Sequence, residues 1–351
     1  MISKIIREDI QEVYGEFKEN LKGLEGKTFL ITGGNGLIAS YLVDLLIHTN
    51  TFLENKIKIK IINKRPVGEK SRLSHLMEDT NVEFIATDVG KDFEIPWKVD
   101  FIVHAASRAN PQSFLEDPLD TIDSNVNGLR TLLEYARKNK VESFLFFSSG
   151  EIYGNPVKEF VPTPESYPGN VDCTHPMACY LEAKRLCETI SMIYFRKYAV
   201  PVKNLRILLS YGPGMRNDGK VVSDFYVASK EKKEIGMWDR GESKRSFCYI
   251  SDTLRGILQV MFKGDSGEAY NVGSDLENLQ IKELAVKVSE LMNNGTIVKP
   301  NLDAPEKKIY GVPTRNLDLT KLRSLGFIPK INLEAGLKRL KSHVEEAGWG
   351  N

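Results

Sequence analysis

Hydrophobic residues between positions 27 and 149 form short apolar runs that alternate with longer amphipathic stretches. The runs are rich in β-branched and aromatic residues, which predicts strands; they are TFLIT at 28–32, IKIKII at 57–62, VEFIAT at 82–87, DFIVHAA at 100–106 and SFLFFSS at 143–149. Helical spacing follows the first run to about Thr49 and returns over 121–139. Repeated strand–helix–strand units predict an α/β fold with a parallel, doubly wound sheet covered on both faces.

An amphipathic helix is predicted ahead of the first strand, within residues 1–26. Its apolar residues recur at steps of three and four, and they are Ile2, Ile5, Ile6, Ile10, Val13, Tyr14, Phe17 and Leu21. Such a stripe usually packs against the main body of a domain. It would also suit a partner or a second copy of the chain.

Chain length and the later pattern predict one large unit with a smaller C-terminal lobe. At 351 residues the chain exceeds the usual size of a single core. The regular alternation assigns residues 27–205 to the doubly wound unit. After NLRILLSYGPG at 204–214 the elements shorten. Residues 206–351 are therefore expected to form mainly a substrate-binding lobe, interleaved with the sheet.

Charge and composition argue against several classes of partner. Lys and Arg total 48 against 47 Asp and Glu, a formal net charge of +1, so no overall field attracts nucleic acid or an acidic membrane. The four cysteines and five histidines show no metal-site spacing, which predicts no metal and a reducing, cytoplasmic setting. No apolar run reaches the length of a membrane span, so we expect neither secretion nor insertion.

A glycine-rich loop, TGGNGLIAS at 32–40, follows the first predicted strand and opens a helix. Gly33 permits a tight turn, and Gly36 lets the backbone approach a pyrophosphate at the helix N-terminus. This context predicts a Rossmann dinucleotide site, because a glycine loop between strand and helix is its signature. The further residues expected in it are Leu37, Ile38, Asp88, Val89, Ala105 and Ala106, with Asp88 accepting from the adenine amino group.

The position that would grip the adenosine ribose is not acidic. The second strand is followed by Asn63 and then by Lys64 and Arg65. The two cations would accept the 2′-phosphate of NADP, or they would form a solvated loop beside NAD. The predicted cofactor is therefore NAD or NADP.

Tyr180 and Lys184 predict hydride-transfer chemistry. They form Tyr-x-x-x-Lys in CYLEAKR at 179–185 and so share one face of a helix. An ammonium there would lower the pKa of the phenol and position it as a general acid/base. Ser149 ends the fifth predicted strand, and Glu151 follows as either a second acid/base or a loop carboxylate.

These segments resemble the extended short-chain dehydrogenase/reductases that modify nucleotide sugars. The resemblance runs from about Lys27 to Phe327, and it includes SNVNGLRTLLEYAR at 124–137 and FFSSGEIYGNP at 146–156. Within that family, HAASRANP, ACYLEAKR, NDGKVVSDF and ESKRSFCYISD are most similar to the UDP-glucuronate decarboxylases. The N-terminal helix lies outside the match.

The resemblance implies a reaction through a ketone at C4 of the sugar. Tyr180 would take the proton of the sugar hydroxyl, Lys184 would hold the nicotinamide ribose, and Ser149 would bond to the reacting oxygen. The ketone acidifies neighbouring C–H bonds, so epimerisation, decarboxylation or 4,6-dehydration can follow, with Glu151 moving the second proton. A net C4 oxidoreductase would stop at the ketone.

The candidate substrate contacts are mostly cationic. Arg245, in GESKRSFCYI, would grip a sugar carboxylate or the nucleotide diphosphate bidentately. The other predicted substrate residues are Arg108, Arg216, Lys220 and Val221, with Arg206 as a further candidate for the diphosphate.

Gly150 is the main departure from the resemblance. Similar dehydratases usually carry Asp at this position as the acid for the leaving hydroxyl, and decarboxylases usually carry Ser. A glycine does neither job. The follow-on reaction therefore stays open between decarboxylation and epimerisation, with dehydration or net oxidation as alternatives.

Two interpretations lie outside this class. A non-catalytic dinucleotide-binding protein would lack Tyr180, Lys184 or Ser149, and all three are present. An NADP-dependent reductase of a small carbonyl compound would fit Lys64 and Arg65 but would not need cations for a diphosphate.

The resemblance also implies a homodimer. Its interface would be a four-helix bundle built from the helix over 121–139 and the Tyr180 helix. The apolar residues of these helices suit either an interface or a buried core, and they are Leu129, Leu132, Leu133, Ile190, Ile193 and Phe195.

Overall fold

The computed structural model describes residues 2–108, 111–231, 234–237, 239–302 and 314–349. Its centre is a parallel sheet of seven strands in the order β11-β6-β5-β4-β1-β2-β3. The strands are β1 Thr28–Thr32, β2 Lys58–Asn63, β3 Val82–Ala86, β4 Phe101–His104, β5 Ser143–Ser149, β6 Val202–Ile207 and β11 Ala269–Val272. This order confirms the predicted Rossmann sheet.

The strand order reverses between β1 and β4, which pair although β2 and β3 intervene in the chain. Thr32, at the end of β1, lies opposite His104 of β4 on one side and Ile62 of β2 on the other. Ligands of open parallel sheets bind at the carboxyl edge where the order reverses. The ends of β1 and β4 therefore define where a site should lie.

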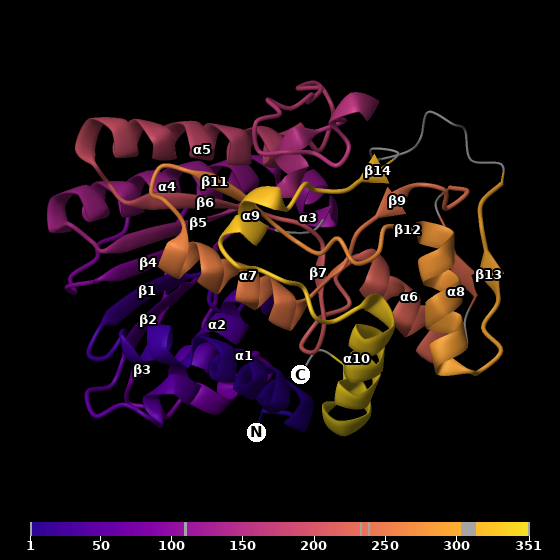
Figure 1. Ribbon diagram of the computed structural model, residues 1–351, viewed down its shortest axis with the longest axis horizontal. Coiled ribbons are helices and arrows are strands. Elements are labelled where there is room, and N and C mark those ends of the chain that lie inside the picture. Colours follow the sequence, from indigo (N-terminus) through magenta and orange to yellow (C-terminus); the bar gives the residue numbers. More distant parts are fainter. Residues whose placement is uncertain (1, 109–110, 232–233, 238, 303–313, 350–351) are drawn as a thin grey trace.

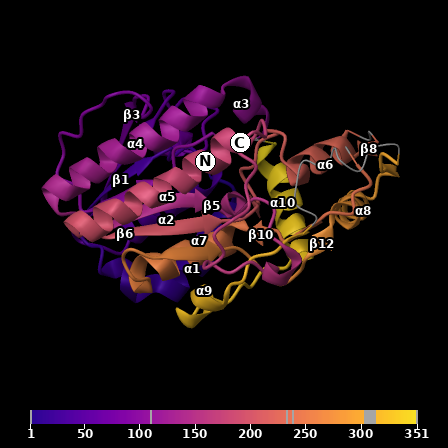
Figure 2. The ribbon, with the colours of Figure 1, turned by 90° about the horizontal axis from the view of Figure 1, so that it is seen from above.

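Helices cover both faces of this sheet (Figure 1). On one face α4 (Pro118–Asn139) and α5 (Ala178–Tyr198) lie side by side (Figure 2). On the other face lie α2 (Leu37–Asn50) and α7 (Ile250–Lys263).

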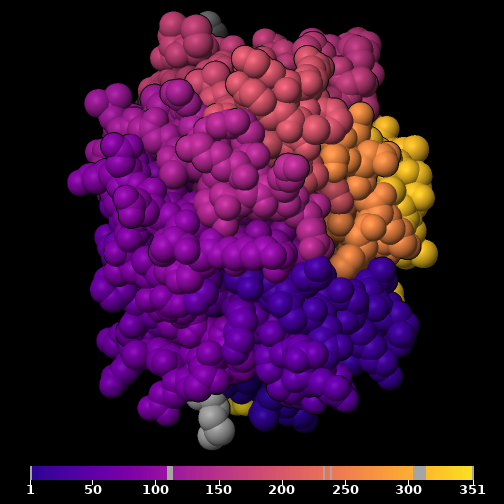
Figure 3. Space-filling model, turned by 90° about the vertical axis from the view of Figure 1, so that its left-hand side faces the viewer, coloured from indigo at the N-terminus to yellow at the C-terminus, as the bar shows by residue number. Residues whose placement is uncertain are grey.

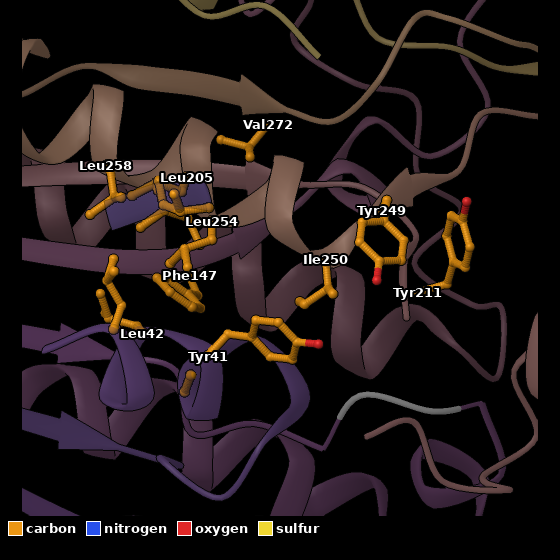
Figure 4. Close-up of a cluster of buried hydrophobic side chains, with 14 of the residues drawn as sticks. Tyr41, Leu42, Phe147, Leu205, Tyr211, Tyr249, Ile250, Leu254, Leu258 and Val272 are labelled. Atoms are coloured by element: carbon orange, nitrogen blue, oxygen red, sulfur yellow. The ribbon is translucent and has the colours of Figure 1, made fainter. Parts of the chain in front are cut away.

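Each face of the sheet has its own hydrophobic cluster. The cluster beneath α2 and α7 brings together Leu42, Phe147 and Leu254, from α2, β5 and α7 (Figure 4). The cluster beneath α4 and α5 includes Leu129 and Leu132, which are fully buried. These two leucines therefore belong to the core, which is one of the two roles that their spacing allowed.

The N-terminal helix α1 (Lys4–Lys22) packs on the outer side of α2 and α7. Its buried residues follow the predicted helical spacing and include Leu21, which is fully buried. Asp9 is buried on the same face and accepts hydrogen bonds from Tyr249 (2.8 Å) and Arg339 (2.5 Å). The helix is thus fastened to the body by apolar and polar contacts.

A smaller lobe lies at one end of the sheet (Figures 1 and 2). Its elements are α6 Val221–Lys230, α8 Ile281–Met292, α10 Leu333–Ala347, β8 Ile235–Gly236, β9 Lys244–Arg245, β12 Leu279–Gln280, β13 Val298–Lys299 and β14 Thr314–Arg315. The remaining α-helices and β-strands are α3 Pro111–Glu116, β7 Ser210–Tyr211, β10 Cys248–Tyr249 and α9 Thr320–Ser324, and 3-10 helices lie at Ser74–Leu76, Gly150–Tyr153 and Lys158–Phe160. Seen from the side remote from the lobe, the surface is formed mostly by the N-terminal half of the chain (Figure 3).

Membrane-spanning helices and metal-binding clusters are both absent from the described residues. In this part of the chain no helix is both long enough and apolar enough to cross a membrane. The same residues contain no group of three or more His, Cys, Asp or Glu arranged to hold a metal ion.

Candidate active site

The glycine loop joins β1 to α2 at the carboxyl edge of the sheet. Gly33 has a φ of +68°, and a Cβ there would lie 2.7 Å from the Cα of Ala106. Gly36 is the N-cap of α2 and brings no side chain to the helix N-terminus. The loop therefore combines the close packing and the open helix end that a pyrophosphate requires.

The other predicted cofactor residues lie at the same edge. Leu37 and Ile38 are the first residues of α2 and are partly buried. The backbone N–H of Ala105 donates to the Thr32 carbonyl (3.2 Å), which fixes the turn after β4. Val89, beyond β3, is buried.

Asn63 lies at the end of β2, beside the glycine loop. Its Oδ1 accepts a hydrogen bond from the backbone N–H of Asn35 (3.1 Å). Asn63 Nδ2 and Asn35 Oδ1 are both buried, and neither has a hydrogen-bond partner among the described residues. One unpaired donor and one unpaired acceptor fit ribose hydroxyls, which accept as well as donate. The residues present therefore fit a dinucleotide.

Lys64 is engaged by two carboxylates. Its Nζ lies 3.0 Å from Asp88 and 2.7 Å from Asp120, on the N-terminal part of α4. These carboxylates already balance the ammonium charge and would repel a 2′-phosphate. Arg65 is exposed. The arrangement thus favours NAD over NADP, and the Asp88 carboxylate expected to accept from adenine is also a partner of Lys64.

Tyr180, on α5, faces the end of β5. Its ring stacks on Phe114 with centroids 4.4 Å apart, and its phenol lies near enough to the Ser149 side chain for that group to influence its pKa. Burial raises the pKa of Tyr180 above its usual range, and the Ser149 side chain opposes that rise. Two of the predicted catalytic residues therefore lie close together.

Lys184 lies one turn further along α5 and is 2% exposed. Its Nζ donates to the Phe147 carbonyl (2.7 Å) and lies 5.8 Å from the centre of the Tyr180 ring. Burial lowers the pKa of Lys184 to about 8. The spacing argument expected this ammonium to lower the pKa of Tyr180, but burial outweighs any such effect.

Glu151 forms an ion pair with Arg315 of β14. The two side chains are 24% and 16% exposed, so the pair is largely withdrawn from water. Burial lowers the pKa of Arg315 to about 10, and its Nε has no hydrogen-bond partner among the described residues. Glu151 is thus held by a cation that retains one donor for a further acceptor.

The structure gives Gly150 an apolar setting. A Cβ at this position would lie 3.1 Å from Leu208 and about 3.5 Å from Leu317. Because leucine methyl groups occupy the space beside it, an acidic side chain at position 150 would be desolvated without a partner. The site therefore differs here from the dehydratases that it resembles.

Arg245 lies on β9, in parallel register with Arg315 of β14. Its Nη1 donates to the Lys244 carbonyl (2.7 Å), and burial lowers the pKa of Arg245 to about 10. Two arginines thus lie on adjacent strands, and Glu151 balances the charge of one of them, Arg315. This arrangement supports the prediction of an anionic substrate.

The remaining substrate candidates divide between two places. Arg216 and Lys220 lie in the turn before α6, where Lys220 pairs with Asp218 (2.7 Å) and is the N-cap residue before Val221. Arg108 instead pairs with two carboxylates at the N-terminus of α4, Asp117 (3.0 Å) and Asp120 (2.7 Å). Its guanidinium is thus already paired beside the predicted cofactor site, so the structure gives the substrate assignment of Arg108 no support.

The structure gives no support to the suggestion that Arg206 binds the diphosphate. Its guanidinium is buried against Glu188 (2.7 Å) and donates to the Tyr153 hydroxyl (2.9 Å). Glu188 also accepts a hydrogen bond from Ser148 (2.5 Å), the neighbour of Ser149. Through Glu188, Arg206 therefore helps to hold the end of β5 in place.

Sequence reasoning did not find Arg315 or Arg72. Arg72, in the loop after β2, donates to the carbonyls of Asn35 (2.8 Å) and Gly214 (2.5 Å). Neither arginine belongs to a recognisable motif, and each is far in sequence from the residues that it contacts. The cation in PTRNLD at 313–318 has no local pattern that would distinguish it from a solvated one.

Fold and site together define a class of protein. A Rossmann sheet with a glycine loop, a Ser149–Tyr180 pair and a buried Lys184 is the arrangement of a short-chain dehydrogenase/reductase. The family described as the NAD dependent epimerase/dehydratase family matches residues 29–273. The chain belongs to this family, whose cofactor is NAD.

Similar proteins of known identity include decarboxylases and an epimerase. UDP-glucuronic acid decarboxylase 5 of Arabidopsis thaliana is 34% identical over 310 residues, which cover 88% of this chain and 86% of that protein. UDP-glucuronic acid decarboxylase 1 of Xenopus tropicalis is 30% identical over a stretch that covers 95% of this chain and 77% of that protein. The solved structure of the UDP-glucose 4-epimerase of Thermotoga maritima is 27% identical, with a TM-score of 0.75. The match covers 91% of this chain and 99% of that one.

Proposed function

We propose that this enzyme decarboxylates a UDP-uronic acid, with UDP-glucuronate as the leading substrate. The observation that carries the proposal is the partly buried Glu151–Arg315 ion pair, whose glutamate lies two residues after Ser149. A proton-transfer pair and a second, cation-bound carboxylate give the site two acid/base centres. The identity to two UDP-glucuronic acid decarboxylases supports the same reaction.

The cofactor assigned to this site is NAD. We assign its pyrophosphate to the Gly33–Gly36 loop, its adenosine ribose to Asn63 and its nicotinamide ribose to Lys184. When bound, NAD would supply the acceptor for the C4 hydride and would return that hydride to C4 at the end. Because Lys64 is paired with Asp88 and Asp120, no 2′-phosphate contact is assigned.

Tyr180 performs the first proton transfer in the proposed reaction. It takes the proton of the C4 hydroxyl while Ser149 donates a hydrogen bond to the same oxygen. The pKa of Tyr180 is raised by burial in the protein alone, so a nearby positive charge is needed to make the phenol a base near neutral pH. Lys184, on the same face of α5, supplies one such charge.

Loss of carbon dioxide follows from the position of the ketone. The C4 ketone is β to the carboxylate on C5, so the bond from C5 to the carboxyl carbon breaks and its electron pair moves toward the C4 oxygen. C5 then takes up one proton, which we assign to Glu151. Arg315 would keep Glu151 in place and add a positive charge near the sugar carboxylate.

Dehydration and epimerisation fit this site less well. Dehydration needs an acid at the leaving hydroxyl, and the surroundings of Gly150 are the leucines Leu208 and Leu317. Epimerisation needs no second acid, and its support is the 27% identity to a solved 4-epimerase. It is therefore the second candidate function.

We further propose that the enzyme is a cytoplasmic homodimer. Leu186 and Ile193 of α5 are 47% and 50% exposed, and they lie seven residues apart on one helix face. Leu119 of α4 is also exposed. A second copy would cover these apolar groups by forming a four-helix bundle with α4 and α5.

Product mass tests the proposed reaction. The purified enzyme is incubated with NAD and, in parallel, with UDP-glucuronate, UDP-glucose and UDP-galactose. We expect loss of carbon dioxide from UDP-glucuronate and no change in the mass of either neutral sugar. Unchanged mass with altered retention would favour the epimerase instead, and loss of water would show that Gly150 does not prevent dehydration.

A further inference from the structure

Two loops that belong to different predicted sites are joined by arginines. Arg72, in the loop after β2, donates through Nη1 to the carbonyl of Asn35 (2.8 Å) and through Nε to that of Gly214 (2.5 Å). In the opposite direction, Arg216 donates through Nη2 to the carbonyl of Lys70 (3.3 Å). Asn35 belongs to the glycine loop, whereas Gly214 begins the turn that leads into α6. Arg72 thus links the glycine loop to this turn, and Arg216 ties the turn to the loop that carries Arg72.

The Gly214 peptide is held from both sides. Its N–H donates to Nε2 of His343 (3.2 Å), which is buried on α10. The other ring nitrogen of His343 bonds to the hydroxyl of Ser3 (2.8 Å), the N-cap of α1. Gly214 has a φ of +81°, a conformation that favours glycine. This turn is therefore fixed on its far side by α10 and α1, and Arg72 is its link to the glycine loop.

The bridge also connects the charges of the two loops. The same turn carries Arg216 and Lys220, two of the predicted substrate contacts. Burial, together with the smaller effect of the nearby Arg216 charge, lowers the pKa of Arg72 to about 10, and Asp218 opposes this shift. A desolvated cation is unfavourable unless it makes several good hydrogen bonds. Arg72 makes two, one to each loop.

We propose that Arg72 is a positioning residue that couples NAD binding to nucleotide-sugar binding. A pyrophosphate in the glycine loop fixes the peptide of Asn35, and Arg72 passes this restraint to Gly214 and so to the start of α6. By linkage, a nucleoside diphosphate bound at the turn must strengthen NAD binding by the same factor. The inference rests on the proposed function, because it assigns the turn before α6 to the nucleotide diphosphate.

The test is the coupling factor between NAD and UDP. NAD is titrated calorimetrically into the full-length enzyme, without UDP and at saturating UDP, and the ratio of the two dissociation constants is the factor. We expect about fivefold or more for the wild type. Arg72→Met should bring the factor to about one. Arg72→Lys, which keeps the charge but not the two-carbonyl geometry, should give an intermediate value.

A matched control uses the same loop. Lys70 has an exposed side chain and contributes only its carbonyl to the bridge, so Lys70→Met should keep the wild-type factor. A purely structural role for Arg72 would weaken NAD and UDP equally and leave the factor unchanged, which would overturn the inference. If Arg72→Met does not fold, the coupling factor of Arg72→Lys distinguishes the two roles in the same way.

The outcomes separate this inference from the proposed function. UDP that binds to the wild type without changing the affinity for NAD would overturn the coupling alone. If none of the nucleoside diphosphates UDP, dTDP, GDP and CDP binds, both the proposed function and the coupling are wrong.

Discussion

At the scale of single residues, the site depends on how burial acts on each ionisable group. Burial raises the pKa of the Tyr180 phenol and lowers that of the Lys184 ammonium to about 8, so each group is pushed toward its neutral form. Ser149 partly offsets this at Tyr180. The chemistry therefore depends on contacts among these three residues.

Replacing Tyr180 by Phe should remove the acid/base and little else. The ring would keep its stacking on Phe114, so we expect folding and NAD affinity to be retained. Turnover should fall by about 10²–10⁴-fold, the usual contribution of a positioned acid/base. Steady-state kinetics measure this, with Tyr194→Phe on the same helix as the control. Near wild-type turnover in Tyr180→Phe would remove Tyr180 from the mechanism.

Cofactor preference tests the ion pairs of Lys64. Because Asp88 and Asp120 already balance its charge, we expect the wild type to bind NAD more tightly than NADP. The double variant Lys64→Ala, Arg65→Ala should keep that preference. Titration with each cofactor measures it. A wild type that prefers NADP, with the preference lost in the double variant, would contradict this interpretation.

At the scale of elements, α1 is fastened by a buried carboxylate. Asp9 accepts from Tyr41 of α2 (3.3 Å), Tyr249 of β10 (2.8 Å) and Arg339 of α10 (2.5 Å). Figure 4 shows Tyr41 and Tyr249 close to Ile250, at the end of the cluster under α2 and α7. Asp9 of α1 thus contacts α2, which belongs to the cofactor-binding half. It also contacts β10 and α10, which are continuous with the lobe or part of it.

Asp9 should make stability depend on pH. Burial raises its pKa from 3.8 to about 6, so the folded protein binds this proton more tightly than the unfolded chain does. The stabilisation is complete below about pH 4 and is lost as the pH rises to about 6, with a total on the order of 3 kcal/mol.

Urea unfolding at pH 4 and pH 7 measures this contribution. From pH 4 to pH 7, the free energy of unfolding of the wild type minus that of Asp9→Asn should fall by most of this total of about 3 kcal/mol. Glu12→Gln, which removes another carboxylate partner of Arg339, should leave the pH window in place. An Asp9→Asn difference that does not change with pH would contradict the account.

At the scale of the whole molecule, short-range and long-range features of the sequence differ in what they predict. The apolar runs, the glycine loop and the Tyr180–Lys184 spacing are local patterns, and they predicted the sheet, the cofactor loop and the catalytic helix. Arg315 and Arg72 meet their partners only in the folded chain, so no local pattern identifies them. Arg206 was a sequence candidate for the diphosphate, but in the folded chain it is paired with the buried Glu188.

Self-association tests the exposed face of α5. Ile193→Glu combined with Leu186→Glu should convert a dimer into a monomer, because it places charges on the apolar face. Light scattering coupled to gel filtration measures the mass. Ile297→Glu, at an exposed position of the lobe, should remain dimeric. A monomeric wild type would remove the dimer proposal.

The most direct test of the central claim is the reaction of UDP-glucuronate and NAD in deuterium oxide. Product mass and proton NMR then show where solvent hydrogen enters. A hydride that leaves C4 and returns, followed by protonation at C5, predicts a UDP-pentose with one deuterium at C5 and the original hydrogen at C4. Deuterium at C4, or recovery of UDP-glucuronate unchanged, would contradict the account.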